Sequence, residues 1–286
     1  MALYDDPDYE NPTIPEGINV TQQHPLKEFF ILLVGSVVVI SAAVLVLTSL
    51  AGYLVQYVPF AQEKALLSGL NTSWMQPESS GTARQKQQYL QTLADQLAGN
   101  MALPKDLTIK VHYSADKTVN AMATLGGNIV VFQGLIDVLP NENALAMVMA
   151  HEIAHIQHRH PIVALGRGFA VMLALTSMAG VGDGMMQEWV GNMSMLTLLS
   201  FSRKQEAEAD AEALQGLLRQ YGHVDGASAF FEHAAEMPNM EISPLLSTHP
   251  RVEERISRIR QFGQEQAIAK KHMLKPLPAF LMSGSN

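Results

Sequence analysis

The residues best suited to chemistry lie in the segment His-Glu-Ile-Ala-His, residues 151–155. His151 and His155 are four residues apart, so on a helix their imidazole rings project from one face about one turn apart. Two nitrogens at this spacing can reach one zinc ion at about 2.0–2.1 Å. Glu152 points toward the same cleft, where it can take a proton from water. The pattern indicates a zinc site in which Glu152 is the acid/base. The alternative is that these five residues match by chance.

The surrounding residues predict one helix that carries this segment. Asn141 is a suitable N-cap, and the helix is expected to span residues 142–159, with Pro161 as its stop. The apolar residues 145–150 come directly before the first histidine. They should bury the helix and keep the site dry, which strengthens electrostatic interactions there.

Two histidines leave a catalytic zinc one protein ligand short, and the segment 202–210 offers the best candidate. The chain has no cysteine, so the missing ligand must be a histidine or a carboxylate. On a helix Glu206 and Asp210 share a face, whereas Glu208 points elsewhere. We expect Glu206 to bind zinc and Asp210 to accept the outer N–H of a ligand histidine, which fixes its tautomer. Taken alone, the segment also fits a solvated acidic helix face.

The remaining histidines are less suited to be metal ligands. His158 lies near the same helix face but two turns from His151, so helix-end packing or a surface role is the better interpretation. His160 directly precedes Pro161 and is expected to serve the helix terminus. Five further histidines belong to no constellation and are read as satisfied or exposed: His24, His112, His223, His233 and His272.

One apolar segment, residues 29–54, exceeds the roughly 20 residues that a helix needs to cross a bilayer. It lacks the polar stripe of a core helix and the basic start of a cleaved signal peptide. We therefore predict a transmembrane anchor, with the lipid bilayer as a partner. Residues 1–28 form a polar, proline-containing leader that should be flexible, and residues 55–81 a juxtamembrane connector. Lysine or arginine flanks both ends of the span, so the positive-inside rule does not set its orientation.

Beyond the connector, the pattern predicts an α+β, mainly helical domain over residues 82–265 with a small sheet at its start. Residues 163–201 contain two apolar stretches, which favour a helical hairpin near the membrane over two core helices. The other expected segments are an amphipathic helix at 82–98, strands at 107–113 and 128–132, and a C-terminal tail at 266–286.

The composition narrows the function classes. The 286 residues carry a formal charge of −8 and no basic run, which argues against a nucleic-acid partner. Charged residues make up only 16%, a low share that fits a membrane segment. The absence of cysteine excludes a disulfide framework and any thiolate metal site.

Together these residues resemble metallopeptidase family forty-eight, gluzincins that include the CAAX prenyl protease and HtpX-like proteases; this chain resembles a single-anchor bacterial type. Four pieces carry the resemblance, in family order: Asn120-Ala121 through Gly126-Gly127-Asn128-Ile129-Val130-Val131, His151-Glu152-Ile153-Ala154-His155, Ser202-Arg203 through Glu206 and Asp210, and Ser247-Thr248-His249-Pro250 through Arg255-Ile256. The resemblance implies a minigluzincin-like fold and one Zn²⁺ per chain.

The resemblance also assigns roles to individual residues. It makes His151, His155 and Glu206 the zinc ligands, Glu152 the catalytic acid/base and Asp210 the carboxylate behind the ligands. It implies that strand 128–132 is an edge strand that holds an extended substrate, through Gly127, Asn128, Ile129 and Val130. His249 matches a position at the mouth of the site, where a histidine covers the metal or assists the transition state. A structural role in the loop before the last helix is the alternative for His249.

These patterns lead us to expect a membrane-anchored zinc metalloendopeptidase that cleaves extended or misfolded protein segments in quality control. Another zinc hydrolase, such as an amidase, and a membrane-tethered chaperone or scaffold with a latent zinc site are the alternatives. The expected location is a bacterial inner membrane, with one span and the catalytic domain in the periplasm.

Overall fold

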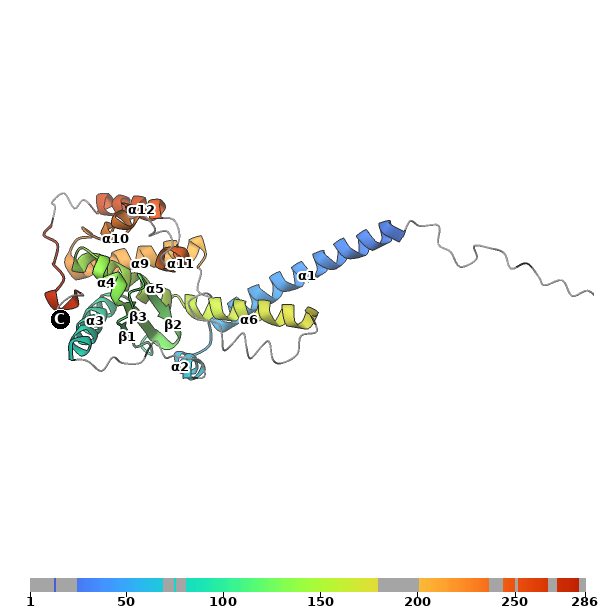
Figure 1. Cartoon of the computed structure of the whole chain (residues 1–286), viewed down its shortest axis with the longest axis horizontal. Helices are drawn as coiled ribbons and strands as arrows, with labels where there is room; N and C mark the ends of the chain where they lie inside the picture. Colours follow the sequence, from blue (N-terminus) through green and yellow to red (C-terminus); the bar gives the residue numbers. More distant parts are fainter. Residues whose placement is uncertain are drawn as a thin grey trace, which may run out of the picture. The chain divides into compact units, whose positions relative to one another are not determined.

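A computed structural model describes residues 13, 25–68, 75, 81–179, 201–236, 244–249, 252–266 and 272–282. Its elements are α1 (Pro25–Val55), α2 (Phe60–Ser68), α3 (Gly81–Asn100), β1 (Lys110–Ser114), β2 (Ala121–Thr124), the 3₁₀ turn η2 (Leu125–Gly127), β3 (Asn128–Phe132), α4 (Gln133–Val138), α5 (Glu142–Gln157), α6 (His160–Ala179), α9 (Arg203–Tyr221), α10 (Ala229–Glu236), α11 (Pro244–Thr248), α12 (Val252–Glu265) and η4 (Ala279–Leu281). Figure 1 shows their arrangement. The predicted α+β, mainly helical class with a small sheet is confirmed.

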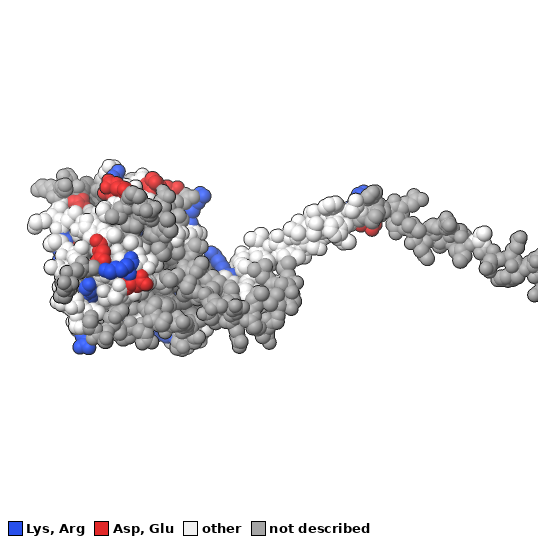
Figure 2. All heavy atoms as spheres, in the orientation of Figure 1, with Lys and Arg blue, Asp and Glu red and all other residues white. Residues whose placement is uncertain are grey.

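The chain divides into two compact units, residues 1–45 and 46–286, which are described separately. Helix α1 begins in the first unit, and its residues 26–55 are long and apolar enough to cross a membrane by length and composition. Figure 2 shows charged atoms on α1 only near its N-terminal end. Apart from residues 13 and 25–28, the predicted leader lies outside the described residues.

The sheet has three strands in the order β1-β3-β2, with β1 parallel and β2 antiparallel to β3. All five residues of β3 are buried, as a run of Asn-Ile-Val-Val-Phe in the middle of a sheet should be. The predicted strand at 128–132 is confirmed. Its prediction as an edge strand is wrong, because β1 and β2 pair with its two sides and leave no free side for a substrate.

Helix α5 lies at the centre of the second unit and packs on α9, α3 and β2. The predicted cap is confirmed: the Asn141 side chain accepts a hydrogen bond from the Ala144 N–H at 2.9 Å. Every residue from Glu142 to Ile156 is buried. The predicted end at Arg159 is wrong, because α5 stops at Gln157 and Arg159 takes a left-handed φ of 64°. Pro161 instead lies in the first turn of α6, where a missing N–H costs nothing.

Helix α9 begins with a capping box in which the Ser202 side chain and Gln205 exchange hydrogen bonds with each other's backbone. It ends at Gly222, whose left-handed φ of 74° closes the last turn. Between these ends, Ala209, Ala213 and Leu217 are fully buried, so small residues let α9 approach α5 closely. This packing faces Glu206 and Asp210 of α9 toward the histidines of α5.

Residues 272–282, which the sequence assigns to a tail, pack on the same core. Leu281 is fully buried, and its carbonyl accepts a hydrogen bond from the Gln133 side chain at 2.9 Å. The Lys275 carbonyl accepts the Glu142 N–H at 2.8 Å, at the start of α5. The C-terminal segment therefore fastens the N-terminal end of the central helix.

Helix α6 forms the first arm of the predicted hairpin, and residues 180–200, which hold most of the second arm, lie outside the described residues. Phe169 and Leu173 on α6 are 49% and 46% exposed. Gly166 approaches Val55 so closely that an added Cβ would meet its side chain at 2.8 Å. Within the second unit, α6 thus starts beside the end of α1.

Candidate metal centre

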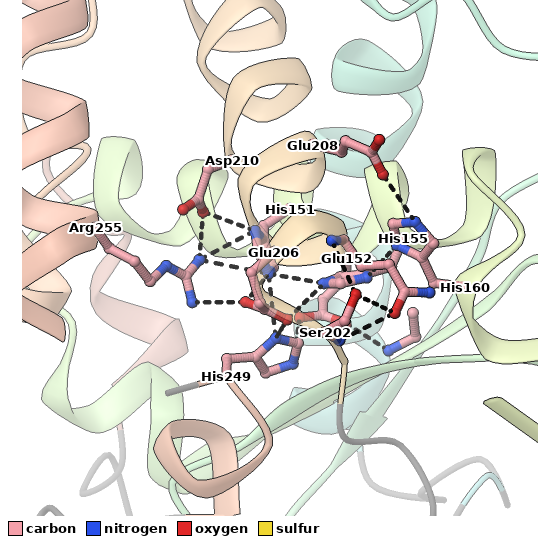
Figure 3. Close-up of polar contacts among 12 residues, drawn as sticks. His151, Glu152, His155, His160, Ser202, Glu206, Glu208, Asp210, His249 and Arg255 are labelled. Carbon is pink, nitrogen blue, oxygen red and sulfur yellow. Dashed lines mark hydrogen bonds and ion pairs between the residues drawn. The ribbon is translucent and has the colours of Figure 1, made fainter. Parts of the chain in front are cut away.

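The two histidines of α5 converge as their spacing requires. The Nε2 atoms of His151 and His155 lie 2.9 Å apart, and both side chains are buried. Glu206 on α9 reaches the same point: its Oε2 lies 3.5 Å from His151 Nε2 and its Oε1 lies 3.4 Å from His155 Nε2. Figure 3 shows the three side chains directed at one another from two helices.

A fourth donor comes from His249, directly after α11. Its Nδ1 lies 2.8 Å from Glu206 Oε1 and 3.2 Å from His151 Nε2. The four buried side chains of His151, His155, Glu206 and His249 each offer one donor atom within 4.8 Å of the others. Three separate segments of the chain therefore contribute to one cluster of metal-binding groups.

The geometry of this cluster fits zinc. Donor atoms bound tetrahedrally to one zinc at about 2.0–2.1 Å lie roughly 3.3–3.4 Å apart, close to the 3.4 and 3.5 Å between Glu206 and the two histidines. The Nε2 atoms of His151 and His155, at 2.9 Å, and His249 Nδ1, at 2.8 Å from Glu206, lie closer together than that. Imidazole nitrogen and carboxylate oxygen are zinc donors. In addition, the buried Glu206 Oε2 has no hydrogen-bond partner, a condition that a metal ion would relieve.

The protonation states of Glu206 and His155 also suit a metal. Burial alone would raise the pKa of Glu206, but His249, His151 and His155 together hold it well below its ordinary value. Burial, followed by the charge of His151, lowers the pKa of His155 well below its ordinary value. At neutral pH Glu206 is therefore ionised and His155 neutral, as metal ligands must be.

A second layer of side chains orients the two histidines from behind. Asp210 Oδ1 lies 3.0 Å from His151 Nδ1, the contact required for the tautomer-fixing role predicted from the sequence. Arg255 donates to the same oxygen at 2.6 Å. Burial raises the pKa of Asp210, but Arg255 and His151 outweigh it and lower that pKa to about 2. Behind His155, its Nδ1 lies 2.8 Å from His160 Nδ1.

His160 and Arg255 are site residues that the sequence pattern missed. His160 was expected to serve a helix terminus, yet the break after α5 turns it back toward His155. Arg255 comes from α12, far along the chain, and stacks on the Phe231 ring at 4.2 Å. The only signal for it was its place in the segment Ser247–Ile256, in which Arg255 itself was assigned no chemical role.

Glu152 lies beside the cluster, and its two carboxylate oxygens differ in their hydrogen bonds. The Ala123 N–H of β2 donates to Oε2 at 2.7 Å. Oε1 is buried without a hydrogen-bond partner and lies 3.6 Å from His249 Nε2. One oxygen therefore holds the carboxylate in place and the other is available to a water molecule at the cluster.

The predicted substrate residues sit elsewhere. Asn128, Ile129 and Val130 belong to the central strand β3, and Gly127 to the turn before it. The strand next to Glu152 is β2, at the sheet edge. Because the Ala123 N–H points to Glu152 and away from β3, the backbone of Ala121, two residues earlier, faces the same way.

A zinc-type cluster on a His-Glu-x-x-His helix, backed by a small sheet, defines a metallohydrolase site. Residues 84–262, more than half of the chain, match the sequence profile of peptidase family M48. The chain therefore belongs to peptidase family M48, a metallopeptidase family, and the resemblance noted from its motifs is confirmed.

Curated relatives agree with this membership. The chain is 31% identical over 170 residues to the mitochondrial metalloendopeptidase OMA1 of Schizosaccharomyces pombe, covering 58% of this chain and 50% of that protein. It is 35% identical over 177 residues to the metalloprotease LoiP of Escherichia coli K12, covering 60% and 68%. It is 27% identical over 211 residues to the Beta-barrel assembly-enhancing protease of Yersinia pestis, covering 67% and 40%. The chain thus spans half or less of two of these relatives.

Proposed function

We propose that this chain is a membrane-anchored, zinc-dependent metalloendopeptidase that hydrolyses peptide bonds in extended or misfolded protein segments. The observation that carries the proposal is the unpaired Glu152 Oε1 beside the cluster of His151, His155 and Glu206. Membership in family M48 supports the same reaction. The proposed ligands of one Zn²⁺ are His151, His155 and Glu206.

The chain's own residues supply the proton transfers. Zinc held by the three ligands contributes Lewis-acid chemistry toward the scissile carbonyl. Glu152 Oε1 accepts a proton from water and passes it to the leaving amine, while Oε2 stays fixed by the Ala123 N–H. Asp210 keeps Nδ1 of His151 protonated, so that Nε2 remains a donor to the metal.

We propose β2 as the strand that holds the substrate, in place of β3. Ala121 is buried, but its backbone faces away from β3, so an extended peptide can pair with it beside Glu152 once this edge is uncovered. Main-chain pairing is nearly independent of side chains, which supports weak sequence preference and a role in protein quality control.

The decisive test is Glu152→Gln in the full chain, measured with unfolded casein and with zinc content. We expect one zinc per chain to be retained and casein cleavage to fall by about 10²–10⁴-fold, because the general base is lost. Glu232→Gln, 40% exposed on α10, is the matched control and should keep the parent rate. Parent-like cleavage by Glu152→Gln contradicts the mechanism, and cleavage of small amides but not casein favours an amidase.

His249 supports the second candidate, a membrane-tethered chaperone or scaffold whose site is latent. Its Nδ1 lies within 2.8–3.2 Å of Glu206 and His151, where a fourth donor would stand in the way of a substrate carbonyl. His249→Ala separates the two candidates. An inactive parent with an active variant indicates a latent site, whereas a slower variant indicates a catalytic role for His249.

For location, we propose a single-pass protein of the bacterial inner membrane with its catalytic domain in the periplasm. The apolar α1 supports the anchor, and the exposed Phe169 and Leu173 support contact of α6 with lipid. Alkaline phosphatase, which is active only outside the cytoplasm, and a fluorescent protein, active inside, should be fused after residue 286. Phosphatase activity without fluorescence is the expected result.

A further inference from the structure

A buried carboxylate outside the proposed site connects three parts of the molecule. Glu63 lies on α2, in the predicted connector, and its side chain is only 4% exposed. Its Oε2 accepts the Gly126 N–H at 2.7 Å, and its Oε1 forms an ion pair with Arg159 Nη2 at 2.7 Å. One side chain thus holds both the turn between β2 and β3 and the junction between α5 and α6.

The first of these contacts leads to the proposed general base. Gly126 has a left-handed φ of 67°, and a Cβ there would meet the Lys64 side chain at 2.6 Å, so α2 lies directly on the turn. Three residues before Gly126, the Ala123 N–H holds Glu152 Oε2 at 2.7 Å. A shift of the turn therefore moves the backbone that positions Glu152.

The second contact leads to a proposed ligand. Arg159 has the left-handed φ that separates α5 from α6, and its guanidinium lies 4.0 Å from the centre of the Phe60 ring. It also donates to the Val58 carbonyl. The next residue, His160, is the one whose Nδ1 lies 2.8 Å from His155 Nδ1. The ion pair therefore secures the break in the chain that brings His160 to His155.

Stability alone is a poor explanation for this carboxylate. Burial raises the pKa of Glu63 even though the Gly126 N–H and Arg159 oppose the shift. A charge kept where burial disfavours it lowers stability, a cost typical of functional positions.

We propose that Glu63 is a positioning residue for the peptidase site, which sets the placement of Glu152 through Gly126 and of His155 through Arg159. This inference rests on the proposed function. It makes α2 a working part of the catalytic domain, although the family match begins only at residue 84.

The test uses the full chain in detergent, with Glu63→Leu and Glu63→Gln. The amide of Glu63→Gln can still accept the Gly126 N–H but cannot pair with Arg159, so this variant separates the two contacts. We expect kcat to fall roughly 10–100-fold in Glu63→Leu, with a smaller fall in Glu63→Gln, because small misplacements of catalytic groups have effects of this size. Glu232→Gln, which breaks the exposed pair with Arg260 at 3.0 Å, is the control and should stay within about twofold.

A purely structural role is distinguished by two further readouts, zinc per chain and the pH profile of kcat/KM. We expect one zinc per chain in each variant and a shifted acid limb of the profile, because the surroundings of Glu152 change. Should Glu63→Leu not fold, Glu63→Gln carries the test alone. Parent-like kcat and pH profile, or a fall in kcat that only follows zinc loss, overturns the inference. A zinc-loaded parent that cleaves no protein refutes the proposed function as well.

Discussion

The described residues contain two groups of histidine and carboxylate side chains that could hold a metal, and they differ in how far their polar atoms are already satisfied. In the first, His151, His155, Glu206 and His249 are all buried, and Glu206 Oε2 has no hydrogen-bond partner. The second, His223, Asp225 and His272, is buried only at His223. Similar residue types thus occur in two unlike settings.

In the second group, hydrogen bonds link all three residues without a metal. Asp225 Oδ2 accepts from both the backbone N–H and Nδ1 of His272, at 2.8 and 3.2 Å. The Asp225 N–H donates to His223 Nδ1 at 3.1 Å, and the two imidazole rings stack at 4.4 Å. This group fastens the C-terminal segment to the end of α9. The comparison indicates that buried polar atoms without a hydrogen-bond partner, more than residue types, distinguish a candidate metal centre.

The largest expected effect is a difference in zinc binding between variants of two carboxylates, Glu206 in the first group and Asp225 in the second. Glu206→Ala should weaken zinc binding by more than about 100-fold, because it removes a proposed ligand. Asp225→Ala should leave one zinc per chain with parent affinity. Zinc content after dialysis and competition with a chelator measure both. Two zinc ions per parent chain, one of them lost in Asp225→Ala, would show that the second group also binds metal.

The next effect concerns the side chain behind the first group. Asp210→Asn keeps the size and an acceptor oxygen but loses the charge that faces His151 and Arg255. Zinc affinity should fall by about 10–100-fold, less than for a ligand. Chelator competition gives the value, with Glu232→Gln on α10 as control. Equal affinity in Asp210→Asn and the control would remove Asp210 from the metal site.

The smallest effect belongs to the second group. His272→Ala keeps the hydrogen bond from its backbone N–H to Asp225 and loses the one from Nδ1, which is worth about 1 kcal/mol. The melting temperature of the zinc-loaded chain should therefore drop by roughly 2–4 °C. Zinc content should not change. His233→Ala, outside both groups, is the control. A large loss of zinc in His272→Ala would show that the second group binds metal, and would contradict its assignment as a purely structural contact.

Helical spacing was sufficient to predict which side chains converge. His151 and His155 share a face of α5, and Glu206 and Asp210 a face of α9, because each pair follows the period of one helix. The role of these residues as ligands stays a prediction. The strand at 128–132 was also predictable, since a short apolar run after two glycines is a local signal.

What could not be predicted depends on contacts between distant segments. The position of β3 between β1 and β2 is a matter of strand order, which the pattern of one strand does not contain. Arg255 reaches Asp210 only because α12 folds back on α9. Glu63 resembled an ordinary connector residue until the fold placed Gly126 and Arg159 against it.

The burial of α5 limits how this protein can diversify. From Glu142 to Ile156 the helix has no exposed residue, so a change at almost any position alters the core as well as the site. Substitutions that adapt the protein to new substrates are therefore tolerated best in the segments around the helix. We therefore expect the sequence of α5 to vary little and the segments around it to accept most substitutions.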